Sequence, residues 1–247
     1  MPPVNKIYTG PAKVLILYTN LFMQKTALVI GATGLIGNYV VQQLLNDATY
    51  KTVRTISRRP TGLTHAKLDE RIVNFEDAAQ LTEAVGQGDV LFSCMGTTNA
   101  NVKGNKALYK FIDIDIPAMV AATAYANNYS TCLLVSAIGA NTKSGNFYIQ
   151  LKGMAEERII ESKLSSIHIF QPSQLLGNRK NEKRTLEKIA QVIISGIGFL
   201  FVGALTKFKP IHYTEVGNAM LVAAKKNTPG VYRYTYKEMK SLLSPGA

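Results

Sequence analysis

The sequence predicts an α/β fold built on a doubly wound parallel sheet of six or seven strands. Three observations favour this class. Residues Thr26–Ile30 have the apolar character of a buried strand and lead into Gly31, Gly34 and Gly37, after which a helical pattern begins. Strand-like and amphipathic helical segments then alternate along the chain. The segment Asp89–Met95 is almost continuously apolar, as in a strand buried on both faces of a sheet.

The composition is that of an ordinary globular protein. The 247 residues are 47% hydrophobic and 18% charged, enough for one large α/β domain with a small appendage. Cys94 and Cys132 form no C-x-x-C pair, and the three histidines lie far apart in the sequence. We therefore expect neither a disulfide framework nor a metal site, and we expect a cytoplasmic location.

The chain is strongly basic, with a formal net charge of +12. Its lysines and arginines are scattered, apart from a denser run at Arg179–Arg184. No nucleic-acid-binding fold or aromatic-interleaved basic ribbon accompanies this run. We expect no nucleic-acid partner, and the charge suits anionic cofactors or substrates.

Residues 1–24 differ from the rest of the chain. Prolines and Gly10 interrupt them, and the apolar run Val14–Phe22 is too short to span a bilayer. Met23 leads directly into the first strand. We interpret residues 1–24 as a leader or non-native extension, with a membrane-interacting arm as the alternative, and residues 25–247 as one domain.

The turn after the first strand predicts a phosphate-binding site. Such a turn presents unpaired backbone N–H groups and the positive end of a helix dipole. Gly31 permits the turn, Gly34 permits close approach of a pyrophosphate, and Gly37 permits close packing of helix on strand. The alternative is a turn without a ligand. The residues expected to contact a dinucleotide here are Gly31, Thr33, Gly34, Leu35, Ile36 and Gly37.

The second strand, Lys51–Ser57, is followed by Arg58 and Arg59. In dinucleotide-binding folds an acidic residue near this point binds the adenosine ribose, and none is present. Two guanidinium groups suit a 2′-phosphate instead, which favours NADP (NADPH) over NAD. The alternative is a solvated basic loop.

The third and fourth strands are expected at Glu70–Phe75 and Asp89–Met95, and a helix capped by Glu76 or Asp77 is expected between them, ending near Val85. The alternative is that a carboxylate at this point lies near the adenine of the cofactor. The fourth strand ends in small residues that suit the wall of a cofactor crevice, and Cys94 is expected to be a packing thiol. The crevice residues expected here are Cys94, Met95 and Gly96.

A long helix is expected at Lys106–Asn127, with Pro117 marking a new first turn. The fifth strand follows at Thr131–Ser136, with Tyr148 and Lys152 beyond it. The tyrosine and lysine are four residues apart and therefore share one helix face. A free tyrosine has a pKa near 10, and a neighbouring ammonium stabilises its phenolate form. We expect Ser136, Tyr148 and Lys152 to support proton transfer at an oxygen while a hydride moves at the adjacent carbon.

These motifs resemble the atypical short-chain dehydrogenases/reductases, which have a Rossmann fold. The resemblance covers roughly residues 25–225 and includes the glycine turn, Ser136 and Tyr148-Ile-Gln-Leu-Lys152. It implies that these three residues are catalytic and that Lys152 also holds the nicotinamide ribose. The family's fourth active-site residue is often asparagine, and Asp113 is the nearest position here.

More narrowly, the chain resembles the Tat-interacting-protein-like branch, whose members bind NADPH and include regulatory proteins. The matching segments are the arginine pair, Cys94–Thr98, Ser136–Ala140 and Asn146–Gly153. Relatives carry Arg-Pro-Gly where this chain has Gln171, Pro172 and Ser173 after a sixth strand at Ser166–Phe170. Pro172 is expected to shape the wall beside the nicotinamide.

The C-terminal portion, from about Gln171, is expected to bind the substrate. Ile189–Leu205 is predominantly apolar between basic flanks, so it is either a lid or dimer-facing helix pair, or a membrane-surface contact. Lys209–Tyr213 is expected to return to the sheet, with Thr214 capping the last helix and a final strand at Val231–Tyr236. His212 is expected to be structural.

Together these patterns predict an NADP-dependent oxidoreductase that acts on a small carbonyl or alcohol substrate. One alternative is an NADPH-binding regulatory or redox-sensing protein with little turnover, and another is a membrane-associated scaffold. A homodimer is compatible with the sequence.

Overall fold

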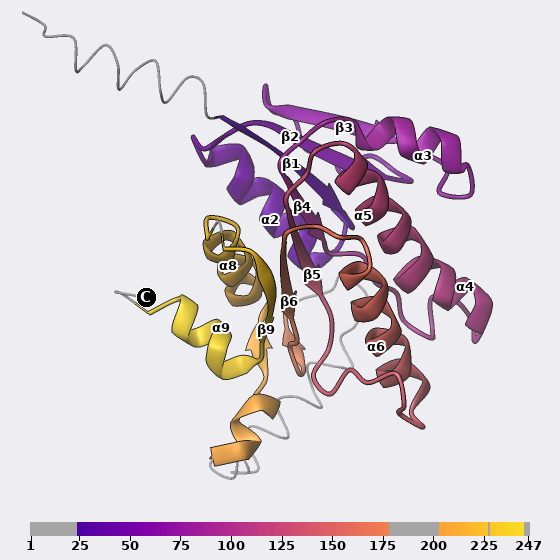
Figure 1. Ribbon diagram of the computed structural model, residues 1–247, viewed down its shortest axis with the longest axis vertical. Coiled ribbons are helices and arrows are strands. Elements are labelled where there is room, and N and C mark those ends of the chain that lie inside the picture. Colours follow the sequence, from indigo (N-terminus) through magenta and orange to yellow (C-terminus); the bar gives the residue numbers. More distant parts are fainter. Residues whose placement is uncertain (1–23, 178–202, 227, 245–247) are drawn as a thin grey trace, which may run out of the picture.

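The computed structural model describes residues 24–177, 203–226 and 228–244, and a parallel sheet of seven strands lies at their centre (Figure 1). This confirms the predicted fold class. The strand order is β3-β2-β1-β4-β5-β6-β9. The strands are β1 (Lys25–Ile30), β2 (Tyr50–Ser57), β3 (Leu68–Ile72), β4 (Val90–Ser93), β5 (Thr131–Val135), β6 (Ser166–Phe170) and β9 (Gly230–Tyr234).

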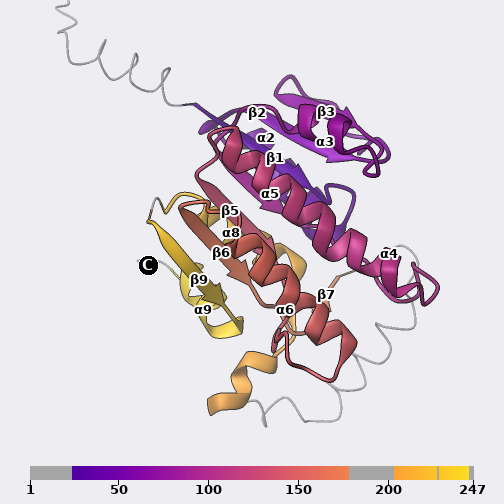
Figure 2. The same ribbon diagram turned by 45° about the vertical axis from the view of Figure 1, so that its right-hand side comes forward.

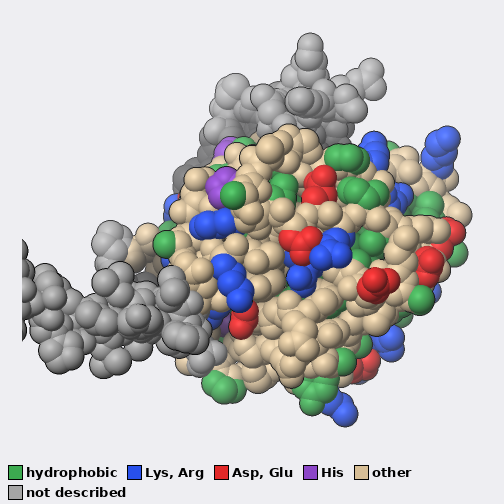
Figure 3. Space-filling model, turned by 90° about the horizontal axis from the view of Figure 1, so that it is seen from above, with side chains coloured by type: hydrophobic (Ala, Val, Ile, Leu, Met, Phe, Trp, Pro, Cys, Tyr) green, Lys and Arg blue, Asp and Glu red, His purple; other side chains and the backbone are tan. Residues whose placement is uncertain are grey.

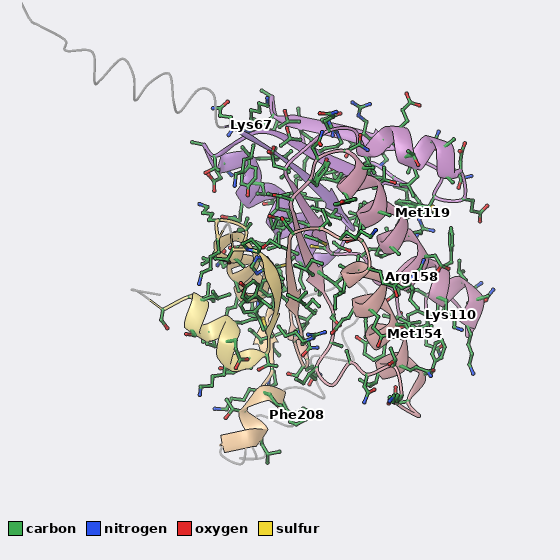
Figure 4. The ribbon with its side chains drawn as sticks, viewed as in Figure 1. Lys67, Lys110, Met119, Met154, Arg158 and Phe208 are labelled. Carbon is green, nitrogen blue, oxygen red and sulfur yellow. The ribbon has the colours of Figure 1, made fainter. Side chains whose placement is uncertain are left out.

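Helices cover both faces of the sheet because its central strands are apolar on both sides. In β1, Val29 packs in the core beneath α2 (Leu35–Asn46), α8 (Tyr213–Ala223) and α9 (Tyr236–Leu242). Ile30 packs in the core beneath α3 (Ala78–Val85), α5 (Ile116–Ala126) and α6 (Phe147–Ile160). Side chains from both layers fill the space around the sheet (Figure 4). The alternation follows from the two-residue period of a strand.

The position of the site follows from the strand order. The chain fills one side of β1 with β2 and β3, and then crosses to place β4 on the other side. Ligands of open α/β sheets bind beyond the carboxyl ends of the strands at such a switch point. The carboxyl ends of β1 and β4 therefore mark the expected crevice.

The predicted helix at 106–127 is continuous but not uniform. It consists of α4 (Lys106–Lys110), one π-helical turn at Phe111–Asp115, and α5, which has Pro117 in its first turn as expected. Figure 2 shows α4 and α5 in line beside α6. The π turn was not predicted, because a local widening of the helix leaves no mark on hydrophobic periodicity.

Several predicted boundaries were wrong. The third strand spans Leu68–Ile72 instead of 70–75, because pairing with β2 stops at Ser57. Residues 209–213 do not join the main sheet: β8 (Ile211–His212) pairs with β7 (Leu175–Leu176) in a separate two-stranded sheet. The cap of α8 is His212 instead of Thr214, which makes His212 structural as expected.

The C-terminal residues belong largely to the main fold. β9 is the seventh strand and spans Gly230–Tyr234 instead of the predicted 231–236, and α8 and α9 pack in the same core as α2. The last helix is therefore α9. Among the described residues from Gln171 onward, Gln171–Gly177 and the stretch from η3 (Gly203–Phe208) to His212 lie outside the main sheet and its covering helices.

Three notable sequence segments fall wholly or mostly outside the described residues. These are the 1–24 extension, the basic run 179–184 and the apolar stretch 189–205, so their interpretations stay predictions. Within the described parts of the chain, no helix has both the length and the apolar character needed to cross a membrane.

Candidate nucleotide-binding and active site

The glycine turn joins β1 to α2. Gly31 has a φ of 77°, and a Cβ atom there would lie 2.5 Å from the carbonyl carbon of Cys94, so no other residue fits without a shift. Gly34 is the N-cap of α2 and supplies no capping side chain, and the first turn contains no acidic residue. Thr33 and Gly34 are exposed. The positive end of α2 therefore carries neither a capping side chain nor an acidic residue in its first turn, as suits a phosphate-binding turn.

The loop after β4 lies against this turn, as predicted. Cys94 is packed on Gly31, and burial raises the pKa of its thiol. A thiol with a raised pKa is a poor nucleophile, which agrees with a packing role. Gly96 follows two residues later, and a Cβ there would be 3.5 Å from Lys152 Nζ and 3.6 Å from Asp113 Oδ2. The loop after β4 therefore lies against both the glycine turn and the helix that contains Lys152.

Helix α6 brings Tyr148 and Lys152 together. The Asn146 side chain caps this helix by accepting a hydrogen bond from Ile149 N. Tyr148 is 41% exposed, whereas Lys152 is buried, and its Nζ atom lies 5.9 Å from the centre of the Tyr148 ring. The Lys152 ammonium donates to Asp113 Oδ2 at 2.7 Å. The tyrosine is thus accessible to solvent, while the lysine is held in place by its ion pair with Asp113.

Ser136 is placed differently from the other two expected catalytic residues. It follows β5 directly, and its hydroxyl donates to Glu156 Oε1 at 2.6 Å. A hydroxyl has one proton, so in this arrangement Ser136 can only accept a hydrogen bond from a further partner. The next residue, Ala137, has no hydroxyl.

Glu156 is a buried residue that the sequence analysis missed. Its carboxylate accepts hydrogen bonds from Ser136, from Gln171 Nε2 at 2.7 Å and from Arg233 Nε at 3.2 Å. Three donors offset the cost of burying a charge. The spacing of Tyr148, Lys152 and Glu156 by four residues each, on one helix, is the pattern that could have identified it.

The remaining predicted residues lie at the same edge of the sheet. Arg58 and Arg59 follow β2, which pairs with β1 on the side away from β4, and both are exposed. Ser57 Oγ donates to the Arg59 carbonyl at 2.6 Å and fixes the turn. Pro172 is buried, and its carbonyl accepts from Ile138 N at 3.0 Å, which joins the loops after β5 and β6.

Comparison with known proteins agrees with this geometry. Residues 31–193 match the model of a family described as NAD(P)H-binding. The protein named FMP52-1, mitochondrial, of Scheffersomyces stipitis is 33% identical over 88% of this chain and 98% of its own length. The protein named FMP52, mitochondrial, of Candida albicans is 30% identical over 82% of this chain and 89% of its own.

Solved structures share the fold at low sequence identity. A UDP-N-acetylglucosamine 4-epimerase from Methanobrevibacter ruminantium superposes with a TM-score of 0.64 at 17% identity, over 86% of this chain and 76% of its own. The Bordetella bronchiseptica enzyme WbmH, solved with NAD+, superposes with a TM-score of 0.66 at 16% identity, over 86% of this chain and 76% of its own.

The expected cytoplasmic location is wrong, because these curated relatives are named as mitochondrial proteins. Both cysteines are indeed free thiols, but free thiols do not distinguish one reducing compartment from another. The resemblance to atypical short-chain dehydrogenases/reductases is confirmed at the level of the nucleotide-binding fold. The chain belongs to the NAD(P)H-binding family that the matched model describes, together with its relatives named FMP52.

Proposed function

We propose that the chain is an NADP-dependent oxidoreductase that acts on a small carbonyl or alcohol substrate, in a mitochondrial location like that of its named relatives. The supporting observation is the position of Gly96, which lies against Lys152 and Asp113 at the end of the loop that packs on the glycine turn. A nucleotide held at the α2 N-terminus and along this loop would bring its nicotinamide toward Tyr148 and Lys152.

The residues present fit such a cofactor. The uncapped α2 N-terminus would hold the pyrophosphate, and Arg58 and Arg59, at the end of the neighbouring strand, would hold a 2′-phosphate. When bound, the nicotinamide supplies or accepts a hydride at the substrate carbon.

Tyr148 handles the proton in this proposal. Its exposed phenol donates a proton from Oη to a carbonyl oxygen in the direction of reduction, and takes it back in the direction of oxidation. The Lys152 ammonium stabilises the phenolate that is left and holds the nicotinamide ribose. Ser136 donates a hydrogen bond to a substrate carbonyl oxygen only if its hydroxyl leaves Glu156.

The first test is calorimetry with NADPH and NADH on the wild type and on Arg58→Ala/Arg59→Ala. We expect NADPH to bind at least tenfold more tightly than NADH, which is about 1.4 kcal/mol, and the double variant to lose this preference. Equal affinities for the two nucleotides in the wild type would contradict the 2′-phosphate assignment. No binding of either nucleotide would contradict the oxidoreductase proposal as a whole.

A second candidate function is an NADPH-binding regulatory protein with little turnover. The hydrogen bond from Ser136 to Glu156 favours it, because the hydroxyl expected to orient a substrate is already engaged. Tyr148→Phe separates the two candidates in a carbonyl-reductase screen. If the chain is an enzyme, the variant loses turnover and keeps its NADPH affinity; wild type without turnover across the screen supports the regulatory role.

The proposed partner is a small molecule, with no nucleic acid. Basic and acidic side chains are interspersed on the face seen from above (Figure 3), and no continuous basic stripe is visible there. Peripheral membrane contact through residues 189–205 and a homodimer remain predictions. Sedimentation with anionic vesicles at low salt tests the first, and light scattering tests the second.

A further inference from the structure

A cavity of about 340 Å³ lies beside Glu156, and none of the residues proposed to bind the nucleotide or to move the proton lines it. Its walls are the loop 139–142 after β5, the middle of α6, Gln171 after β6, and Arg233 of β9. Cavities of this size accommodate small-molecule ligands. The cavity is therefore a candidate for a second binding site.

The cavity follows from the way the last strand joins the sheet. β9 pairs with β6, and Arg233 lies opposite Ile169, which packs in the core beneath α6. The two-residue period of a strand therefore directs Arg233 to the α6 face of the sheet. Gly153 lets the loop 139–142 approach α6 closely, because a Cβ atom there would lie 2.4 Å from Thr142 N. The loop, the helix and the edge strand thus form the walls of one cavity.

Arg233 brings free hydrogen-bond donors to this cavity. Its Nε atom donates to Glu156 Oε2 at 3.2 Å, whereas its two terminal amino groups make no hydrogen bond within the described parts of the chain. The Arg233 side chain is 49% exposed, and that of Glu156 is 5% exposed. A guanidinium fork with free amino groups binds a carboxylate through two parallel hydrogen bonds. Arg233 can therefore bind a carboxylate while its Nε atom stays on Glu156.

The charges in the walls select the kind of ligand. The described lining contains one cation, Arg233, and two carboxylates, Glu156 and Glu157. Glu156 is paired with Arg233, whereas Glu157 is exposed and accepts a hydrogen bond from Thr142 Oγ1 at 3.1 Å. A simple anion would be repelled by Glu157, and a simple cation would be repelled by Arg233. A ligand that carries both charges satisfies both walls.

We infer that this cavity binds a small zwitterion, with its carboxylate on the Arg233 amino groups and its ammonium on Glu157. An amino acid is the simplest ligand of this class. Gln171 lies in the same wall, and because its Nε2 atom donates to Glu156, its Oε1 atom is left to accept from the ligand. The site does not depend on the proposed function, because it shares no residue with the nucleotide site.

Calorimetry with ω-amino acids on the full chain tests this site. β-Alanine, 4-aminobutyrate and 6-aminohexanoate differ in the separation of their two charges, whereas butyrate and butylamine carry one charge each. We expect at least one ω-amino acid to bind the wild type, at least about fivefold more tightly than butyrate or butylamine. Wild type that binds no ω-amino acid overturns the inference, and so does a single-charge probe that binds as tightly as the best ω-amino acid.

Two variants assign the two ends of the ligand. Arg233→Lys keeps a cation beside Glu156 but loses the guanidinium fork, so it should weaken the best ω-amino acid by about fivefold or more. Glu157→Gln should weaken the same ligand by a similar factor and bind butyrate at least as tightly as the wild type, because only the ammonium loses its partner. Arg158→Gln and Glu161→Gln are the matched controls, exposed and outside the cavity, and should bind as the wild type does.

Urea denaturation of each variant separates loss of the site from loss of structure. If Arg233→Lys is unfolded, Glu157→Gln decides, because its side chain is exposed. Unchanged affinity in folded Arg233→Lys and Glu157→Gln overturns the inference, as does equal weakening by the two control variants. Wild type that binds an ω-amino acid but no NADPH refutes the proposed function alone. Wild type that binds NADPH but no ω-amino acid refutes this site alone.

Discussion

His168 makes the stability of the fold depend on pH in the weakly acidic range. This residue of β6 is 0% exposed, with Nε2 against Ser166 Oγ at 3.0 Å and Nδ1 against the Tyr234 hydroxyl at 2.9 Å. Its ring stacks on Tyr232 and Tyr234 of β9. Burial, and to a smaller extent the charge of Lys226, lower the pKa of His168 from 6.5 to about 4.

The sign and size of the effect follow from linkage. The folded protein keeps His168 neutral, whereas the unfolded chain binds a proton below pH 6.5, so stability falls as pH decreases from about 6.5 toward 4. A shift of this size corresponds to a loss of about 2 to 3 kcal/mol in the free energy of unfolding by pH 4. The carboxylates of Asp47, Asp69, Glu215 and Glu238 have lowered pKa values and add their own losses at more acidic pH.

Urea denaturation at intervals between pH 7 and 4 measures this dependence. We expect His168→Gln to be less stable than the wild type at pH 7 but to lose about 2 to 3 kcal/mol less between pH 6.5 and 4. His65→Gln, at an exposed loop position, is the matched control and should keep the wild-type slope. The reasoning is refuted if His168→Gln and the wild type show parallel curves over this range.

Three further changes test how the site and its surroundings are held. Gly31→Ala should destabilise the fold by more than about 2 kcal/mol in urea denaturation and abolish NADPH binding, because φ is positive and Cys94 leaves no room; wild-type affinity would contradict the close packing. Arg54→Ala should cost about 2 to 3 kcal/mol, since Asp69 and the Val85 carbonyl each lose a charged donor and keep only Arg71 and Tyr129, respectively; a loss below 1 kcal/mol would refute this. Asp77→Ala should cost about 1 kcal/mol through the lost cap of α3, with NADPH affinity unchanged; weaker NADPH binding would instead favour a place near the adenine.

The part of the site that sequence predicts well is the part made by neighbouring residues. The first strand, the turn at Gly31 and the helix after it follow one another within some twenty residues, so their chemistry is local. Tyr148 and Lys152 lie one helical turn apart for the same reason. The parallel sheet also follows from the sequence, because strands that alternate with helices build a parallel sheet.

What sequence did not predict depends on contacts between distant segments. Arg233 on β9 donates to Glu156 on α6, which is 77 residues away in the sequence. Lys152 donates to Asp113, which is 39 residues away. No local pattern at either end specifies the partner. The π turn that directs Asp113 inward has no periodicity of its own, and β8 pairs with β7 through only two residues of each strand.

Two groups of paired side chains involve α6, one around Lys152 and one around Glu156. They differ in which hydroxyl group they leave free to contact a substrate. On one side, Asp113 neutralises Lys152 and leaves the Tyr148 phenol exposed. On the other, Ser136 donates its only hydroxyl hydrogen bond to Glu156, whose charge is compensated by Arg233. A substrate oxygen that needs a second donor must therefore draw Ser136 away from a carboxylate that already has two other donors. Because Gln171 and Arg233 would still satisfy Glu156, the cost of that rotation is one charge-assisted hydrogen bond, about 1.5 to 3 kcal/mol, and not the loss of a buried charge pair. That cost is small enough for substrate binding to supply, so the hydrogen bond from Ser136 to Glu156 is compatible with the proposed oxidoreductase activity.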